Sequence, residues 1–324
     1  MRAPGCHAIA CLSLLLACGE AAALCIGLKF VGVPSVATFA GDGGGYNVYD
    51  PRTHLQSVSF QVQAEATGAT CEYFVALSAG QSGDFARRRL TQGASALGYN
   101  AYTNAGKTIF KAPPTAAQGE VIAGKFPVVI ALTQTNHHSF FWTVDRQQIV
   151  PARRTHYSDA NLSLDLYAGT LLGAPKLVAS APITFRALVE SSVDLSLVKP
   201  GAPFDISDTT QRIDFGVLAS GAQRAVDLVV RSNAGYAVSL QSLNRQAMVH
   251  AEAPAVRDTV AYQLVLSGGG VDLSSGAPVQ VLSGTGTTPV AGIAFPIEFT
   301  VGEVSGREAA GTYSDIISVT VTAN

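Results

Sequence analysis

The chain has 324 residues, which is long enough for two domains of ordinary size, each with its own core. Only 14% of the residues are charged and the net charge is −2, so nothing suggests nucleic acid or an anionic membrane surface as a partner. The 32 Gly and 15 Pro, together with many Ser, Thr and Val, are typical of short strands joined by turns.

Residues 1–23 have the pattern of an export signal. Arg2 supplies a positive charge, Ala8 to Ala17 form a short apolar run, and Ala21 to Ala23 offer a small-residue cleavage site. The run is too short to span a bilayer, and no later stretch is long enough. Leu15-Leu16-Ala17-Cys18 also resembles a bacterial lipobox, which would lipidate Cys18. Both alternatives predict an exported protein.

Removal of the signal would leave two cysteines, Cys25 and Cys71. Two cysteines in an oxidising compartment usually pair with each other. A metal site would need further ligands, and neither residue has a Cys or His at a suitable short spacing. We therefore expect a Cys25–Cys71 disulfide that ties the first strand of the exported chain to the first domain.

Alternation of apolar and polar residues recurs along the chain. It is clear in SVSFQVQAEA (57–66), GYAVSLQS (235–242) and IAFPIEFTV (293–301), where every second residue is apolar. Clusters of small residues, such as Gly41–Gly45, separate these runs and predict turns. No stretch of a dozen residues holds a convincing helical period. The predicted fold class is therefore all-β, with β-sandwich domains of the immunoglobulin type.

An internal repeat sets the number of domains. Tyr157-Ser158-Asp159 precedes the alternating run NLSLDLY, and Tyr313-Ser314-Asp315 precedes the alternating run IISVTVT. The interval between the two copies corresponds to about one sandwich domain. We therefore predict an N-terminal domain over 24–174 and a C-terminal domain over 175–324, divided within the small-residue stretch 169–180.

No group of residues predicts a catalytic, metal or cofactor site. His137 and His138 are neighbours that would point to opposite faces of a strand, with no carboxylate within four residues. Asp159 and Asp315 recur at the same place in each repeat, which favours turn capping over acid–base chemistry. Arg87-Arg88-Arg89 is expected to be a solvated loop at a strand edge, with binding of an anionic polysaccharide as the alternative.

Ser139-Phe140-Phe141-Trp142 contains the only Trp of the protein. Three consecutive aromatic residues cannot all face one side of a strand, so at least one is exposed unless both faces are buried. One interpretation is a surface-binding loop formed by Phe140, Phe141 and Trp142. The alternative is that Phe140 and Trp142 fill the core while Phe141 packs on the second sheet.

The run Ala310–Val321 (AGTYSDIISVTV) resembles the terminal strand of the spore coat protein U domain family, which includes the Csu-type (archaic) chaperone–usher pilins. Ile213–Gly216, followed by Ser232-Asn233 and Gly235-Tyr236, resembles a second motif of that family, and Leu97–Thr103 resembles a third. The first repeat departs from the pattern, because it reads Arg153-Arg154-Thr155-His156-Tyr157 and lacks the usual Ala-Gly before the Tyr.

The resemblance implies a subunit of a surface fibre, and two tandem domains suggest the tip adhesin of an archaic chaperone–usher pilus. Such a protein is exported through the periplasm and mediates attachment and biofilm formation. Its implied partners are a periplasmic chaperone, an outer-membrane usher and a neighbouring pilin that donates a strand. The C-terminal domain is then an incomplete sandwich, with Ile317, Val319 and Val321 lining one side of a donor-strand groove.

Two other functions stay open at the level of the sequence. One is a secreted coat protein with the same domains but no fibre. The other is a secreted hydrolase built on a β-sandwich, although no G-x-S-x-G motif occurs.

Overall fold

The computed structural model describes residues 25–65, 70–128, 132–252 and 258–324. The predicted export signal and Cys18 lie outside these residues. Within the described ranges no helix has the length and apolarity needed to cross a membrane.

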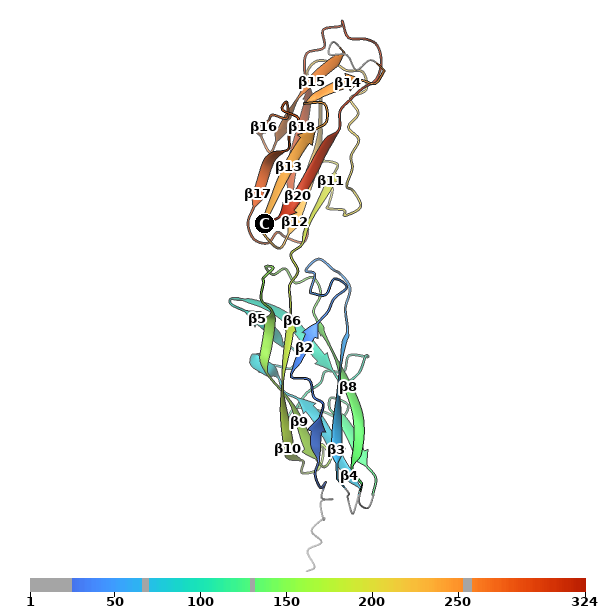
Figure 1. The fold of residues 1–324 in the computed structure, drawn as a ribbon, viewed down its shortest axis with the longest axis vertical. Coiled ribbons are helices and arrows are strands. Elements are labelled where there is room, and N and C mark those ends of the chain that lie inside the picture. Colours follow the sequence, from blue (N-terminus) through green and yellow to red (C-terminus); the bar gives the residue numbers. More distant parts are fainter. Residues whose placement is uncertain (1–24, 66–69, 129–131, 253–257) are drawn as a thin grey trace, which may run out of the picture.

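The chain forms two β-rich units arranged end to end (Figure 1). The first unit is one 10-stranded sheet that curls on itself, with the order β1-β3-β8-β6-β5-β9-β10-β2, with β4 paired to β9 and with β7 paired to β4. Its strands are β1 (Lys29–Val31), β2 (Val36–Phe39), β3 (Gln56–Ala64), β4 (Cys71–Leu77), β5 (Arg89–Gln92), β6 (Ser95–Tyr102), β7 (Ile122–Phe126), β8 (Gln134–Val144), β9 (Tyr157–Ala168) and β10 (Lys176–Ala187).

The second unit has a seven-stranded sheet, β11-β12-β18-β15-β14-β19 with β16 on β15, and a three-stranded sheet, β17-β13-β20. Its strands are β11 (Val193–Val198), β12 (Gln223–Ser232), β13 (Tyr236–Ser242), β14 (Ala247–His250), β15 (Thr259–Leu266), β16 (Gly269–Val271), β17 (Val279–Gly284), β18 (Ile293–Val301), β19 (Tyr313–Ser314) and β20 (Ile317–Ala323).

The apolar residues that alternate with polar ones in the sequence are the residues whose side chains are buried in the structure. Along β3, the side chains of Val58, Phe60 and Val62 are buried while those of Ser57 and Ser59 are exposed. Each unit buries its own apolar cluster. The predicted all-β fold class is therefore confirmed.

The boundary between the units lies later than the sequence suggested. Strand β10 pairs with β9 along its length and with β2 through Thr184–Ala187, so it belongs to the first sheet. The small-residue stretch 169–180 is not a linker, because 169–175 form the turn of the β9–β10 hairpin and 176–180 are the start of β10. A division at 174/175 would cut this hairpin, and the first unit instead extends through Val189, which belongs to its core and forms a bridge with Tyr46.

The repeated Tyr-Ser-Asp motifs build the same contact in both units. Asp159 accepts hydrogen bonds from the Asn161 amide at 3.0 Å and from the Tyr99 hydroxyl at 2.8 Å. Asp315 accepts them from the backbone amide of Ile316 at 2.8 Å and from the Tyr262 hydroxyl at 2.6 Å. Burial, together with the adjacent carboxylate, raises the pKa of both tyrosines well above the usual range. The two aspartates are structural caps, as predicted.

The predicted disulfide is confirmed. Cys25 and Cys71 are bonded, their Cα atoms lie 5.1 Å apart, and the bridge spans a sequence separation of 46. It joins the segment before β1 to the first residue of β4.

Candidate functional site

The aromatic segment is not an exposed loop. Phe140, Phe141 and Trp142 lie in β8, where Phe140 and Trp142 have 0% and 1% exposure. The Trp142 ring centroid is 4.5 Å from that of Phe185, inside the core of the first unit. Phe141 is half-buried on the opposite face of the strand. The surface-binding loop prediction is therefore wrong, because strand alternation turns two of the three rings inward.

Exposed apolar side chains gather instead at one end of the first unit. The register places the end of β9 (Ala168) beside Tyr73 of β4 and the start of β10 (Lys176). It also pairs Ala64, at the end of β3, with Gln134 at the start of β8. Residues 65 and 70, residues 127–128 and 132–133, and the turn 169–175 therefore lie at the same end of the sheet. In Figure 1 this end points away from the second unit.

We call this region the distal apolar end and define it by five exposed side chains. Their exposures are 48%, 53%, 66%, 89% and 51% for Ile26, Val128, Leu132, Leu172 and Leu177, respectively. Isolated exposed apolar residues are common, so no single one of them indicates an interaction surface. The grouping of five such side chains at one end of the unit does.

The β9–β10 turn presents Leu172 on an anchored loop. Gly169 has a φ of 97°, which favours glycine, and the Gly173 amide donates to the Thr170 carbonyl at 3.1 Å. Leu171 packs against a small buried cluster that includes Phe74, while the next residue, Leu172, points to solvent. The turn therefore holds an apolar side chain outward at little conformational cost.

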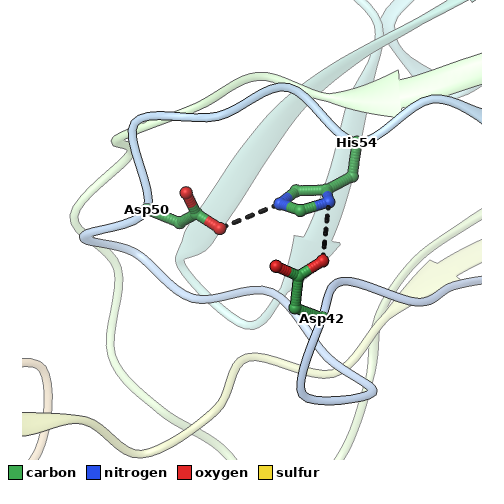
Figure 2. Close-up of side chains that lie close together, drawn as sticks. All are labelled: Asp42, Asp50 and His54. Atoms are coloured by element: carbon green, nitrogen blue, oxygen red, sulfur yellow. Dashed lines mark hydrogen bonds and ion pairs between the residues drawn. The ribbon is translucent and has the colours of Figure 1, made fainter.

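A cluster of charged residues lies at the other end of the first unit, in the loop 40–55 (Figure 2). The His54 ring nitrogens are 3.4 Å from an Asp42 oxygen and 2.8 Å from an Asp50 oxygen. These three side chains have the donor types of a cation site. Arg52, however, contacts Asp42 at 2.6 Å and Asp50 at 2.9 Å, so both carboxylates already have a cationic partner. The arrangement is an ion-pair network that closes the loop.

In the part of the second unit that the structure describes, two sheet edges on the same side pair with no further strand. Strand β11 ends one sheet and β20 ends the other, and the two strands approach within 8 Å between Cα atoms. Among the residues that the structure describes, no ladder joins β11 to β20. The sandwich is therefore open between these strands, which lie side by side in Figure 1.

Apolar side chains along both open edges are incompletely covered. On β11 these are Val193, Leu195 and Leu197, and on β20 they are Ile317, Val319 and Val321, all partly buried against the second core. By contrast, the part of β9 that follows the first Tyr-Ser-Asp motif, as β20 follows the second, buries Leu162, Leu164 and Leu166 fully. The predicted groove residues thus form one half-covered row, and β11 supplies a facing row that the sequence did not indicate.

Sequence and structure comparisons give only remote likenesses. No protein-family profile matches the chain, and no curated protein matches it. Among solved structures, the chaperone–tip subunit complex of the archaic chaperone–usher Csu pili of Acinetobacter baumannii is 14% identical, with 89% of this chain and 98% of that one covered and a TM-score of 0.45. The CupB6 tip adhesin of Pseudomonas aeruginosa is 10% identical, with coverages of 90% and 94% and a TM-score of 0.33. At these values the neighbours' functions do not transfer to this chain.

Proposed function

We propose that this protein is an exported adhesive subunit of a surface fibre, placed at its tip. The distal apolar end binds apolar surfaces, and the open side of the second unit accepts a strand from another chain. In this proposal the first unit is the adhesin domain and the second is the domain that joins the fibre. Binding through the distal apolar end leads to attachment of the cells and to biofilm formation.

The observation that carries the proposal is the placement of two incomplete surfaces in different units. Exposed apolar residues lie at the end of the first unit that is remote from the second, and the unpaired edges lie in the second unit. A protein that binds with one end and assembles with the other needs this separation. A soluble monomer has no use for either surface, because both favour aggregation.

The partner of the second unit is proposed from the chemistry of its open side. Two unpaired edges offer backbone N–H and C=O groups, and two half-covered apolar rows offer contacts for alternate side chains. An extended apolar strand satisfies both requirements at once. We propose that a periplasmic chaperone supplies this strand first, that an outer-membrane usher receives the complex, and that a neighbouring pilin then donates a strand.

The adhesive surface is tested with the double variant Leu132→Ser and Leu172→Ser. We expect attachment of fibre-bearing cells to polystyrene to fall at least about tenfold, since apolar burial contributes about 1.5–3 kcal/mol for each Leu. The melting temperature should stay unchanged, because both side chains are exposed. Attachment is normalised to the amount of protein displayed on the cells.

Leu243→Ser is the matched control, because Leu243 is 68% exposed but lies in the second unit. It should leave attachment per displayed protein at the level of the unmodified chain. Unchanged attachment by the double variant would refute the distal apolar end as the binding surface. Equal losses in the double variant and the control would refute it as well.

A further inference from the structure

The connection from β11 to β12 begins with a segment that folds back onto β11. We call residues 199–208 the edge loop. Its Asp208 carbonyl accepts a hydrogen bond from the Leu197 amide at 2.7 Å, and its Asp205 amide donates to the Ser196 hydroxyl at 3.2 Å. The Gly201 amide donates to the Asp227 carboxylate of β12 at 2.8 Å. The edge loop is therefore attached to both strands.

The contact at Leu197 covers the open edge. Strand β11 is antiparallel to β12, and in such a pair the N–H and C=O of one residue point to the same side. The Leu197 N–H reaches Asp208, so it points away from β12 and toward the unpaired side. A strand that adds to β11 by the usual ladder would use this same N–H. The edge loop thus occupies a hydrogen-bonding position that a docked strand requires.

The edge loop is held in place by an arginine of β12. The Arg231 guanidinium carbon lies 3.7 Å from the ring centroid of Phe204, which belongs to the edge loop. The same guanidinium lies 4.7 Å from the ring centroid of Tyr49, which belongs to the first unit. The Arg231 side chain is 14% exposed, so these stacking contacts are largely shielded from water. The Arg231 side chain therefore contacts both the edge loop and the first unit.

Tyr49 is positioned by its own unit and by the second one. Its amide donates to the Asn47 side chain at 2.9 Å, and its hydroxyl lies 3.3 Å from the Thr288 hydroxyl across the junction. The adjacent Asp50 belongs to the ion-pair network that closes the loop 40–55. The ring that stacks on Arg231 is therefore fixed by the first unit and is only 7% exposed.

We propose that the Tyr49–Arg231–Phe204 stack couples the contact between the two units to the position of the edge loop on β11. With Tyr49 in place, the edge loop stays on Leu197 and uptake of a strand beside β11 is disfavoured. An incoming strand displaces the Asp208 carbonyl and loosens the stack. By thermodynamic reciprocity, strand docking then weakens the contact between the units. The regulatory meaning of this coupling rests on the strand-accepting function proposed above.

The test is amide hydrogen exchange at Leu197 in the full exported chain, resolved to single residues. We expect Tyr49→Ala and Phe204→Ala each to speed exchange at Leu197 about tenfold, which corresponds to about 1.4 kcal/mol. The amides of Leu228 and Val230, in the centre of β12, serve as internal references and should keep their rates. Tyr49→Phe keeps the ring and removes only the hydroxyl, so it should keep the rate at Leu197.

Two outcomes would overturn the proposal. One is an unchanged rate at Leu197 in Tyr49→Ala, which would show that the first unit does not influence the edge loop. The other is equal acceleration at Leu197 and Leu228, which would show a general loss of stability in the second unit. Exchange is measured at a protein concentration below the onset of aggregation and without any partner or surface, so this test and the attachment test can fail independently.

Discussion

At the scale of the residue, Arg88 shows how strongly context decides the role of a charged side chain. Its neighbour Arg87 is solvent-exposed as expected, whereas Arg88 is fully buried. The Arg88 guanidinium donates to the Phe110 carbonyl at 2.6 Å and to the Asn100 side chain at 2.8 Å. Burial lowers its pKa to about 10. It also donates to the Ser78 carbonyl at 3.0 Å. The expectation of a solvated loop is therefore wrong for Arg88, whose buried guanidinium links the segments around Ser78, Asn100 and Phe110.

Asp50 gives a prediction about pH. A hydrogen bond from the Arg52 side chain is the main cause that holds the pKa of Asp50 far below its usual range, with further bonds from the Arg52 amide and His54. Since the folded pKa is below the unfolded value of about 3.9, the stabilisation is fully present above about pH 4. It is lost as the pH falls toward the folded pKa.

Asp50→Asn should therefore lower the melting temperature at pH 7, and the difference from the unmodified chain should shrink below about pH 4. Thermal unfolding followed across this range measures both effects. Glu298→Gln is the control, since its carboxylate is exposed on β18. A difference that stays constant down to pH 2 would contradict the ion-pair explanation.

At the scale of the element, the bridge between Cys25 and Cys71 should be the strongest single constraint on the first unit. It fastens the segment before β1 to β4, across a sequence separation of 46. The double variant Cys25→Ser and Cys71→Ser should lower the free energy of unfolding by about 4 kcal/mol, because a loop of this size restricts the unfolded chain.

Urea unfolding followed by fluorescence measures this effect, because the single Trp142 is buried in the first unit. A reducing agent should destabilise the unmodified chain and leave the double variant unaffected. An equal midpoint for the oxidised chain and the double variant would count against the prediction.

At the scale of the whole molecule, the two open edges should make the protein dependent on a partner. Strand β20 exposes its edge, the edge loop covers only part of the edge of β11, and both edges lie next to half-covered apolar rows, so isolated molecules can pair with one another. We expect the exported chain to aggregate or be degraded when it is produced alone. Co-production with a periplasmic chaperone encoded beside it should give a soluble one-to-one complex.

Light scattering and size-exclusion chromatography distinguish these results. Stable monomers at high yield without any chaperone would contradict both the open edges and the proposed strand acceptance. The absence of neighbouring chaperone and usher genes would favour a coat protein without a fibre.

The sequence by itself determined the all-β class, the Cys25–Cys71 bridge and the capping roles of Asp159 and Asp315. These features depend on local alternation, on turn chemistry and on the small number of cysteines, all of which can be read along the chain. The half-covered row of β20 also followed from its alternation, although strand docking there stays a prediction.

Only the tertiary structure decided the unit boundary, the burial of the aromatic segment 140–142 and the location of the exposed apolar residues. Strand β10 belongs to the first unit because it pairs with β2, a strand far away in the sequence. Trp142 is buried because Phe185 packs against it. Leu132 and Leu172 share one end of the unit because strand register brings separate loops together. Such long-range pairings depend on packing across the sheets, so they cannot be predicted from the composition of a single segment.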